Sequence, residues 1–315
     1  MEASGARRAW PIWMAVVPVA LWVPIRLFGL ESGFPLIPLI AYTPYVAIAA
    51  FFLAGVALAL RNWAAAALAW LATICLAMAV LPRAIGSEAV ELSGHRQLAV
   101  LSANIHHGIA DPEVLAGLVE RLRPDLLSVQ ELTPSFAREL RAAGIESLLP
   151  ESSLAVERDV SGGGLYARHP LTELPEPRRF RFRMPRAALG LPGGRRLRLV
   201  GVHPFPPLRT RIGEWESALE SLPSAGAGAP WILAGDFNAT LDHAELRDLV
   251  ERGYRDAGDV TGSGLEPTWP SGGYRSPPVT IDHILVDSRI GVAEYEVFDL
   301  PGSDHRAVFA RLALP

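Results

Sequence analysis

Two short polar motifs far apart in the chain carry residue types suited to phosphoryl chemistry. The first is Gly-Asp-Phe-Asn at 235–238, and the second is Ser-Asp-His at 303–305. Each places a carboxylate beside a group that can bind a phosphate oxygen or transfer a proton. Asn104 and Glu131 lie upstream, each near the C-terminal end of an apolar run. Together these residues could build one metal-assisted phosphohydrolase site.

Some of these residues also have a purely structural interpretation. Asn104 alone is typical of a turn after a strand, and Asp236 with Asn238 could form an Asx-turn at the end of the run Trp-Ile-Leu-Ala-Gly. Glu131 is less ordinary, because a carboxylate at the end of an apolar strand needs a partner or a metal ion. Hard divalent cations such as Mg²⁺ need few carboxylate ligands, so one glutamate with one or two further oxygens suffices.

His305 is the best candidate for a general base, because imidazole titrates near neutral pH and a neighbouring carboxylate can fix its tautomer. In the run Thr-Ile-Asp-His-Ile-Leu-Val, alternation along a strand places Asp282 and His283 on opposite faces, so we expect only Asp282 to point into the site. His203 ends another apolar run, where a half-buried structural histidine is also common. Four histidines have no comparable sequence context and are left out of the expected site: His106, His107, His169 and His243.

Alternating apolar runs and amphipathic segments after residue 95 predict a layered α/β domain. Strands are expected at 97–105, 125–132, 164–168, 196–203, 231–236, 280–286 and 306–314. Helices are expected at 113–123, 135–143, 212–222 and 244–252. Most of the candidate site residues therefore lie at the ends of expected strands.

The first 82 residues are apolar enough to cross a membrane three times. The chain has 315 residues, of which 50% are hydrophobic, and its mean hydropathy of +0.23 is too high for an ordinary soluble protein. Segments 10–30, 36–60 and 63–82 are each about long enough to cross ~30 Å of hydrocarbon. A cleaved signal peptide is the alternative for the first segment. That segment is long, lacks a clear small-residue cleavage site and is followed by two further spans.

Basic residues near these segments predict their orientation. Arg7, Arg8 and Arg61 lie on one side of the membrane in this arrangement, whereas Arg26 and Arg83 lie near the other side. Because basic flanks favour the cytoplasmic side, we expect a cytoplasmic N-terminus and an extracytoplasmic domain after the third crossing. Residues 83–95 are then a juxtamembrane linker, and residues 96–315 are long enough to bury the core of a single domain.

Charge and cysteine content exclude little but favour some partners over others. The formal net charge is −4, whereas a protein that relies on broad attraction to nucleic-acid phosphates is usually basic. The single cysteine, Cys75, lies within the third apolar segment, so there is no disulfide framework. We therefore expect no stable nucleic-acid partner.

The candidate residues occur in an order that resembles the endonuclease/exonuclease/phosphatase superfamily: Asn104, Glu131, His203, Asp236 with Asn238, Asp282, and Asp304 with His305. That superfamily includes DNase I-like nucleases, abasic-site endonucleases, neutral sphingomyelinases and inositol-polyphosphate 5-phosphatases. The resemblance covers about residues 97–314 and includes the glycine-rich segment at 162–171. It implies a DNase I-like, four-layered α/β sandwich with two central sheets and helices outside.

The resemblance also implies a metal site and a general base. A divalent cation, Mg²⁺ or Mn²⁺, would sit on Glu131, with Asn104 and Asp304 nearby. His305, oriented by Asp282, would activate water for in-line attack on phosphorus.

Three further residues would act on the phosphoryl group itself. Asp236 would hydrogen-bond the nucleophile or assist proton transfer, while Asn238 and His203 would stabilise charge on the phosphoryl oxygens. His203 resembles the histidine of the DNase I and phospholipase branches. Abasic-site endonucleases have tyrosine at the matching place, so the resemblance disfavours abasic-site repair.

The resemblance does not determine the substrate, but the expected location at the outer face of a membrane narrows the range of substrates. A tethered domain on the outer face of a membrane meets little nucleic acid but abundant lipid phosphates. Three-span chains of this type resemble actinobacterial membrane proteins of the vancomycin- and teicoplanin-resistance type, which implies a polyprenyl phosphate or another cell-envelope lipid phosphate. We therefore expect a monomeric, membrane-anchored phosphohydrolase or phosphodiesterase whose partners are the lipid bilayer and a lipid-linked phosphate ester.

Two other functions stay open. An extracellular-face nuclease should show a basic groove with stacking aromatic side chains, and the sequence offers only scattered candidates. A catalytically silent binding or immunity module would have no chemical need for the full set of polar site residues.

An arginine-rich segment adds a candidate for substrate binding. Residues 178–198 hold eight arginines, and Arg179, Arg181 and Arg183 alternate with aromatic and apolar residues as on one face of a strand. This face is either a solvated sheet edge or a cradle for an anionic head group.

Overall fold

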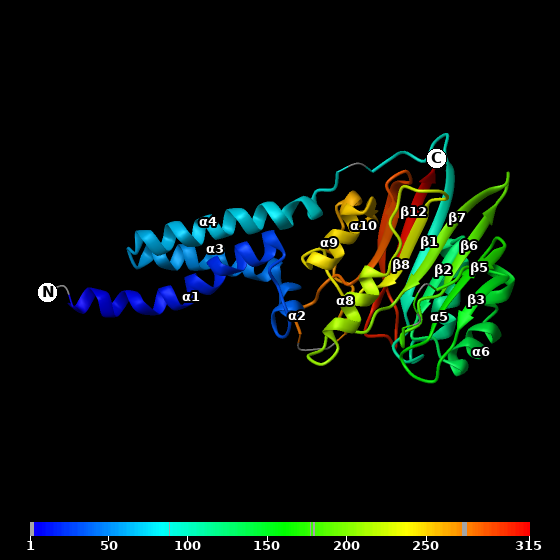
Figure 1. Ribbon diagram of the computed structural model, residues 1–315, viewed down its shortest axis with the longest axis horizontal. Helices are drawn as coiled ribbons and strands as arrows, with labels where there is room; N and C mark the ends of the chain where they lie inside the picture. The colour runs from blue at the N-terminus through cyan, green and yellow to red at the C-terminus, as the bar shows by residue number, and fades with distance from the viewer. Residues whose placement is uncertain (1–2, 88, 177, 179, 273–275) are drawn as a thin grey trace. The chain divides into compact units, whose positions relative to one another are not determined.

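The computed structural model describes residues 3–87, 89–176, 178, 180–272 and 276–315, and it divides into two compact units (Figure 1). One unit holds Met1–Pro82 together with Leu241–Ala244, and the other holds Arg83–Thr240 with Glu245–Pro315. The division falls close to the end of the last expected membrane span.

The first unit is helical, with α1 (Ala3–Phe28), α2 (Leu36–Ile40), α3 (Thr43–Ala59) and α4 (Trp63–Val80). The stretches Trp10–Phe28 and Trp63–Ala84 are long and apolar enough to cross a membrane, whereas α3 is a shorter apolar helix. Within the expected span at 36–60, the helix is interrupted between α2 and α3. Pro44 lies in the first turn of α3, where its missing N–H costs nothing.

Small residues fill the interior of this unit and large apolar residues face outward. Its buried cluster combines two residues of α1 with alanines of α3 and α4: Ile12, Val16, Ala54, Ala57, Ala65, Ala66 and Ala69. Phe28, Phe52, Trp63 and Met78 are each more than 60% exposed. This distribution is the reverse of that in a water-soluble bundle and is typical of helices that pack within lipid.

The second unit contains two six-stranded sheets. The first sheet has the order β11-β12-β1-β2-β4-β3, with β1 (Arg96–Asn104), β2 (Leu126–Gln130), β3 (Glu151–Ala155), β4 (Gly163–Ala167), β11 (Gly291–Asp299) and β12 (Arg306–Leu314). The second has the order β5-β6-β7-β8-β10-β9, with β5 (Leu171–Glu173), β6 (Arg186–Leu191), β7 (Arg195–Val202), β8 (Trp231–Asp236), β9 (Tyr254–Asp256) and β10 (Asp282–Asp287). Only β1–β2 and β7–β8 pair in parallel among these neighbours.

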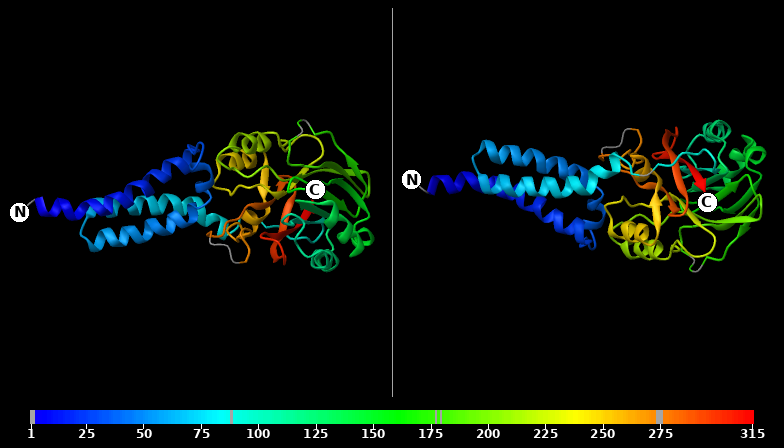
Figure 2. Two further views of the ribbon diagram at one scale, coloured as in Figure 1. Left: turned by 90° about the horizontal axis from the view of Figure 1, so that it is seen from below. Right: turned by 90° about the horizontal axis from the view of Figure 1, so that it is seen from above.

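The two sheets pack face to face and carry helices on their outer faces (Figure 2). The core between the sheets includes Val100, Leu199, Ile232, Ile284 and Val308. A second cluster joins the outer face of the first sheet to α5 (Pro112–Leu122), α6 (Pro134–Ala142) and α7 (Ile145–Leu148). This unit also contains α8 (Ile212–Glu220), α9 (Ala244–Glu251, whose first residue groups with the helical unit) and α10 (Ala257–Thr261). The short helix η1 (Leu81–Ala84) spans the boundary between the two units.

Burial on both faces explains why the central strands read as apolar runs. In β1, Leu98 and Val100 face the other sheet, while Leu101 and Ala103 face the helices. In β8, a Cβ atom at Gly235 would lie 1.9 Å from the carbonyl oxygen of Val202 on the paired strand β7. Only glycine therefore fits immediately before Asp236.

The seven strands and four helices expected from the alternation of apolar runs and amphipathic segments are all present, with ends shifted by up to a few residues. The sequence interpretation missed strands β3, β5, β6, β9 and β11 and the short helices α7 and α10. The segment 83–95 is also more than a linker, because the Ser87 amide donates to the Val260 carbonyl at 3.0 Å and the Val90 amide donates to the Val292 carbonyl at 2.9 Å.

The expectation of a strand through the arginine-rich segment is wrong, because residues 180–185 form a loop. Arg181 contacts Asp159 at 3.3 Å and Arg183 contacts Glu176 at 3.3 Å, so nearby carboxylates already pair with both guanidinium groups. Arg179 lies outside the described residues. Arg181 and Arg183 therefore do not lie on a strand face.

Candidate active site

The expected site residues come together at one edge of the two sheets, where parallel strands end. Asn104 is the last residue of β1, and Glu131 follows the end of its parallel neighbour β2. In the other sheet, His203 follows β7 and Asp236 ends its parallel neighbour β8. Parallel strands place their carboxyl ends on the same side, which explains why segments far apart in the sequence meet here.

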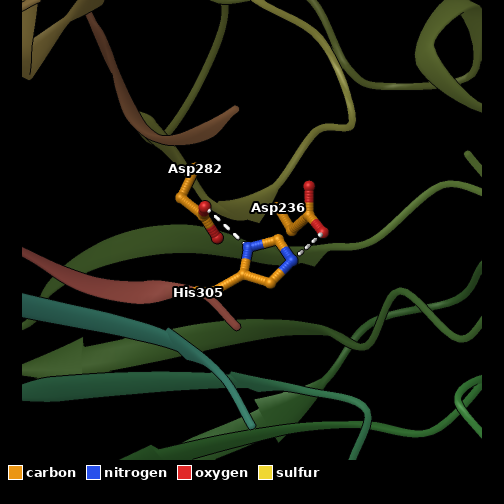
Figure 3. Close-up of side chains that lie close together, drawn as sticks. All are labelled: Asp236, Asp282 and His305. Atoms are coloured by element: carbon orange, nitrogen blue, oxygen red, sulfur yellow. Dashed lines mark hydrogen bonds and ion pairs between the residues drawn. The ribbon is translucent and has the colours of Figure 1, made fainter. Parts of the chain in front are cut away.

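The antiparallel strands deliver the other two residues to the same edge. Asp282 begins β10, directly opposite Asp236 in the register, and His305 immediately precedes β12. The His305 Nδ1 lies 2.9 Å from Asp282 Oδ2, and its Nε2 lies 3.6 Å from Asp236 Oδ2 (Figure 3). The Asp282 carboxylate therefore fixes the ring and directs Nε2 toward Asp236. As the alternation predicted, His283 points to the other face of β10, where it contacts Asp256.

Asp236 is buried and is the most heavily bonded carboxylate of the cluster. It accepts hydrogen bonds from the Asn104 side-chain amide at 3.0 Å and from the Asn238 backbone amide at 2.7 Å. The second bond closes a tight turn, with Asn238 at φ 48°. The Asx-turn that the sequence allows for Asp236 and Asn238 is therefore present, and Asp236 also belongs to the site cluster.

His203 is buried with its ring held edge-on to Phe182, at a centroid distance of 4.8 Å. Among the described residues, its Nδ1 has no hydrogen-bond partner, whereas Nε2 lies 3.8 Å from Asp236 Oδ2 and 4.0 Å from Glu131 Oε1. A buried N–H without an acceptor is costly, so the proton belongs on Nε2. This tautomer aims a donor into the space between the two carboxylates.

Burial and mutual charge control the titration of these groups. Burial lowers the pKa of His203 to about 3, helped by the nearby charge of His305, so this ring is neutral at physiological pH. Burial also raises the pKa of Asp236, and the charge of Asp282 acts in the same direction. For His305, burial is outweighed by the negative charges of Asp282 and Asp236, which raise its pKa. These side chains by themselves therefore keep a proton on His305 at neutral pH.

Glu131 has the properties expected of a metal-binding carboxylate. Its side chain is 12% exposed, and Oε2 accepts a 2.6 Å hydrogen bond from the His107 backbone amide. Oε1 has only a 3.3 Å contact with the Asn104 side-chain amide. A nearly buried carboxylate oxygen with spare lone pairs is a donor that Mg²⁺ or Mn²⁺ accepts. Glu131 itself has a left-handed φ of 61°, which turns its side chain back into the site.

The other two expected metal ligands, Asn104 and Asp304, differ in their hydrogen bonding. Asn104 directs its amide nitrogen at Glu131 and Asp236, while its Oδ1 accepts from the His106 backbone amide at 3.0 Å. In this arrangement Asn104 orients carboxylates rather than offering an oxygen. The Asp304 Oδ1 is buried and lies 2.5 Å from His106 Nδ1, so a cation or its bound water would share this oxygen with His106.

A second group of potential ligands consists of Asp236, Asp282 and His305, whose candidate atoms lie within 4.8 Å of one another. His305 Nδ1 is already engaged by Asp282, and its Nε2 faces Asp236. This arrangement matches a proton-transfer relay better than a metal cage, so we assign the cation to the Glu131 side.

Two residues that the sequence interpretation left out also belong to the site. His106 places Nδ1 2.5 Å from Asp304 Oδ1, and Trp269 donates its indole N–H to Asp304 Oδ2 at 3.1 Å. His106 and His107 both have positive φ, 44° and 56°, in the loop after β1. The sequence pattern does not predict these positive φ values. The position of both histidines just after Asn104, however, indicates that they could lie near the site.

A cleft opens beside Asp304. Its volume is about 560 Å³, and the lining residues include His106, Ile109, Ser271, Leu300 and Asp304. Ile109 is 61% exposed at this position. The cleft therefore offers both polar and apolar surface next to the cluster.

Comparison with known proteins agrees with this architecture. The model of the endonuclease/exonuclease/phosphatase family matches residues 101–305. Solved structures with the same fold include an endonuclease/exonuclease/phosphatase from Beutenbergia cavernae, at 20% identity and a TM-score of 0.54, covering 70% of this chain and 72% of that one. D. rerio TDP2 complexed with a single-strand DNA product matches at 18% identity and a TM-score of 0.56, covering 69% and 98%. No curated protein sequence matches the chain.

The fold and the site define an α/β-sandwich phosphoesterase, with the polar residues of both sheets gathered at one edge. The chain belongs to the endonuclease/exonuclease/phosphatase family. The expected superfamily and the two-sheet sandwich are thereby confirmed, and hydrolysis of phosphoric esters is the reaction class of this family. The structural neighbours are below 25% identity and show the fold alone.

We expect His305→Ala and Asp236→Asn each to lower kcat by about 10² to 10⁴-fold, because one removes the positioned imidazole and the other the carboxylate that faces it. Steady-state kinetics on folded protein would measure this. His169→Ala is the matched control, since His169 is half-buried near Asp125 at the opposite end of β2. A His305→Ala variant that retains more than about a tenth of the activity would exclude His305 as the base.

We also expect Asp282→Asn to lower the pKa of His305, because it removes a negative charge that stabilises the imidazolium. The proton should then leave His305 at a lower pH than in the unsubstituted chain. NMR titration of labelled histidine side chains, with the His305 signal assigned from a His305→Gln sample, measures the shift. His203 should stay neutral over the same range, and an unchanged His305 titration in Asp282→Asn would contradict the assignment.

Proposed function

We propose that the chain is a membrane-anchored, divalent-metal-dependent phosphohydrolase or phosphodiesterase that acts on a cell-envelope lipid phosphate at the outer face of the membrane. The observation that carries the chemical part is the buried contact of His305 with Asp282 and Asp236 beside Glu131. The locational part is supported by the apolar helices of the first unit.

In the proposed reaction a water oxygen attacks phosphorus in line with the ester oxygen, which leaves as the P–O bond breaks. His305 takes the proton of the water through Nε2, while Asp282 holds Nδ1 and stabilises the positive charge that forms. The Nε2 donor of His203 faces the same space and would bind a phosphoryl oxygen. Asn238 would supply a further donor there, although its amide nitrogen now lies 3.2 Å from the Pro204 carbonyl.

Glu131 and Asp304 fit a hard cation, because both present buried or nearly buried carboxylate oxygens at the same edge. When bound, Mg²⁺ or Mn²⁺ would stabilise negative charge on the phosphoryl and leaving oxygens and would lower the pKa of His305 into the range of a useful base. The raised pKa of His305 without such a charge is a reason to propose metal dependence.

The first unit supports a lipid-linked substrate. Its helices expose large apolar side chains around a small-residue interior, as expected of three membrane-embedded helices in a multi-pass arrangement. Only a few residues of chain separate the end of α4 at Val80 from Ser87, which is hydrogen-bonded to the second unit. The tether would therefore hold the chemistry near whichever surface of the bilayer the chain emerges from.

The cleft beside Asp304 would receive the organic group of the ester. Its lining includes the exposed Ile109 and the buried Leu300 next to polar His106 and Ser271. A space of about 560 Å³ accommodates a head group or the first part of a lipid chain rather than a whole polyprenyl chain. The rest of such a substrate would stay in the bilayer. The resemblance to vancomycin- and teicoplanin-resistance-type proteins stays a prediction.

A nuclease is the second candidate, because the fold is shared with a TDP2 structure that holds a single-strand DNA product. The net charge of −4 and the carboxylate-paired arginines at 181 and 183 disfavour it. A catalytically silent binding or immunity module is disfavoured, because it would not need the polar site residues that hydrogen-bond to one another here.

We expect the full chain in detergent micelles to hydrolyse a lipid phosphate only when Mg²⁺ or Mn²⁺ is present. The substrates to compare are polyprenyl phosphates, sphingomyelin, inositol phosphates and plasmid DNA, and EDTA should abolish turnover until the cation is restored. Glu131→Gln should raise the cation concentration needed for half-maximal activity. Activity unchanged by EDTA would contradict the proposed metal dependence, and cleavage of plasmid DNA alone would favour a nuclease function.

We further expect the C-terminus to lie outside the cytoplasmic membrane, because Arg7, Arg8 and Arg61 mark the cytoplasmic side. A reporter that is active only after translocation, fused after Pro315, should therefore be active. A second reporter that works only in the cytoplasm, fused at the same position, serves as the control. Activity of the cytoplasmic reporter would overturn both the topology and the argument for an envelope substrate.

A further inference from the structure

His283 is a buried histidine directly behind the active site that the proposed reaction does not use. It is 2% exposed and lies next to Asp282 in β10, with its side chain on the opposite face. Its Nδ1 lies 2.8 Å from Asp256 Oδ2, and its Nε2 lies 2.9 Å from the carbonyl oxygen of Ala239.

Both ring nitrogens of His283 face acceptors. A carbonyl oxygen can only accept, so the contact with Ala239 requires a proton on Nε2. The Asp256 contact requires another proton between Nδ1 and the carboxylate. Burial disfavours a charged ring, but the charge of Asp256 and the hydrogen bonds to Asp256 and Ala239 outweigh it and raise the pKa of His283. The result is a charge-assisted link between Asp256 and the backbone of Ala239.

Ala239 directly follows the turn that carries Asn238. That turn is strained, because Asn238 has a left-handed φ of 48° and its amide donates back to Asp236 at 2.7 Å. On one side of the turn, the Phe237 amide donates to the Ile281 carbonyl at 2.9 Å, and Trp215 donates to the Phe237 carbonyl at 3.2 Å. On the other side, the His283 ring contacts the Ala239 carbonyl.

The rings of His283 and Phe237 also meet edge to face, with centroids 5.6 Å apart. The imidazole thus contacts the residues before and after Asn238. Asp256 in turn is fixed as the N-cap of α10, where it accepts from the Asp259 amide at 2.8 Å. The turn is therefore linked through Asp256 to the start of α10.

We propose that His283, held by Asp256, is a positioning residue that fixes the 237–239 turn and thereby sets the placement of Asn238 for the phosphoryl group. The inference rests on the proposed hydrolysis at the same site, but its structural part does not require that activity. The linkage runs from α10 through Asp256 and His283 to the Ala239 carbonyl.

The test uses the full chain carrying His283→Gln or Asp256→Asn. Glutamine cannot bridge both acceptors, and asparagine leaves the ring in place but removes the charge, so the second variant keeps the test informative if the first is poorly folded. Each should lower kcat by about 10 to 100-fold, as substitutions of groups that orient active-site residues do, with KM changed much less. The Asn238 amide signal in a ¹H–¹⁵N spectrum should move in both variants, whether or not a substrate is known.

Tyr254→Phe is the matched control. It removes another buried hydrogen bond of the same neighbourhood, from the Tyr254 hydroxyl to the Pro223 carbonyl at 2.7 Å, without touching the turn. It should lower Tm while leaving kcat and the Asn238 signal unchanged.

A double-mutant cycle separates positioning from a general loss of stability. If His283 acts through the turn, His283→Gln should cost little further activity in an Asn238→Ala background. A full additional loss there, or a lower Tm with unchanged kcat and an unmoved Asn238 signal, would overturn the proposal. If the unsubstituted chain hydrolyses none of the substrates tested but the Asn238 signal still moves in the two variants, the result would count against the proposed function. It would nevertheless support the linkage through His283.

Discussion

Two buried polar contacts between the sheets are the constraint on which the rest of the site depends. The Asn104 amide from β1 reaches Asp236 at the end of β8, and His305 before β12 reaches Asp282 at the start of β10. Each contact joins one sheet to the other. Removing either partner would leave a buried polar or charged group without compensation, which is among the most destabilising changes in a protein interior. The sheets are therefore held in register at this edge by the same groups to which we assign the chemistry.

Because the same groups join the sheets and form the site, they are buried, and burial explains the electrostatics of the cluster. Asp236, Asp282 and His305 are shielded from water, and the two carboxylates stabilise a proton on the imidazole of His305. A group buried for structural reasons thus acquires a perturbed pKa, as catalytic groups often do. The neutral His203 beside it shows the converse, since burial lowers its pKa and the nearby charge of His305 acts in the same direction. A cation at Glu131 would shift this balance toward an unprotonated His305, which links the metal to the proton transfer.

Sequence patterns predicted the parts of this arrangement that depend on local order. Apolar runs ending in a polar residue located Asn104, Glu131 and Asp236, and strand alternation separated Asp282 from His283. The patterns failed where packing between residues distant in the sequence determines the local structure. Alternation of arginine with apolar residues at 179–184 suggested a strand, but Phe182 instead packs on His203 from a loop, and nearby carboxylates pair with Arg181 and Arg183. Edge strands such as β5 and β9 are only three residues long, too short to give a periodic signal.

The same limit explains why His106 was missed and why the role of His283 was underestimated. His106 reaches Asp304 only because two successive residues after β1 adopt left-handed backbone conformations, which no composition rule requires of histidine. His283 was correctly placed on the face away from Asp282, but that face is not inert. It meets Asp256 and the Ala239 carbonyl, which belong to segments 27 and 44 residues away. A strand with both faces buried can thus serve the site from either side: one face supplies a reacting group, and the other holds the loop that supplies the next one.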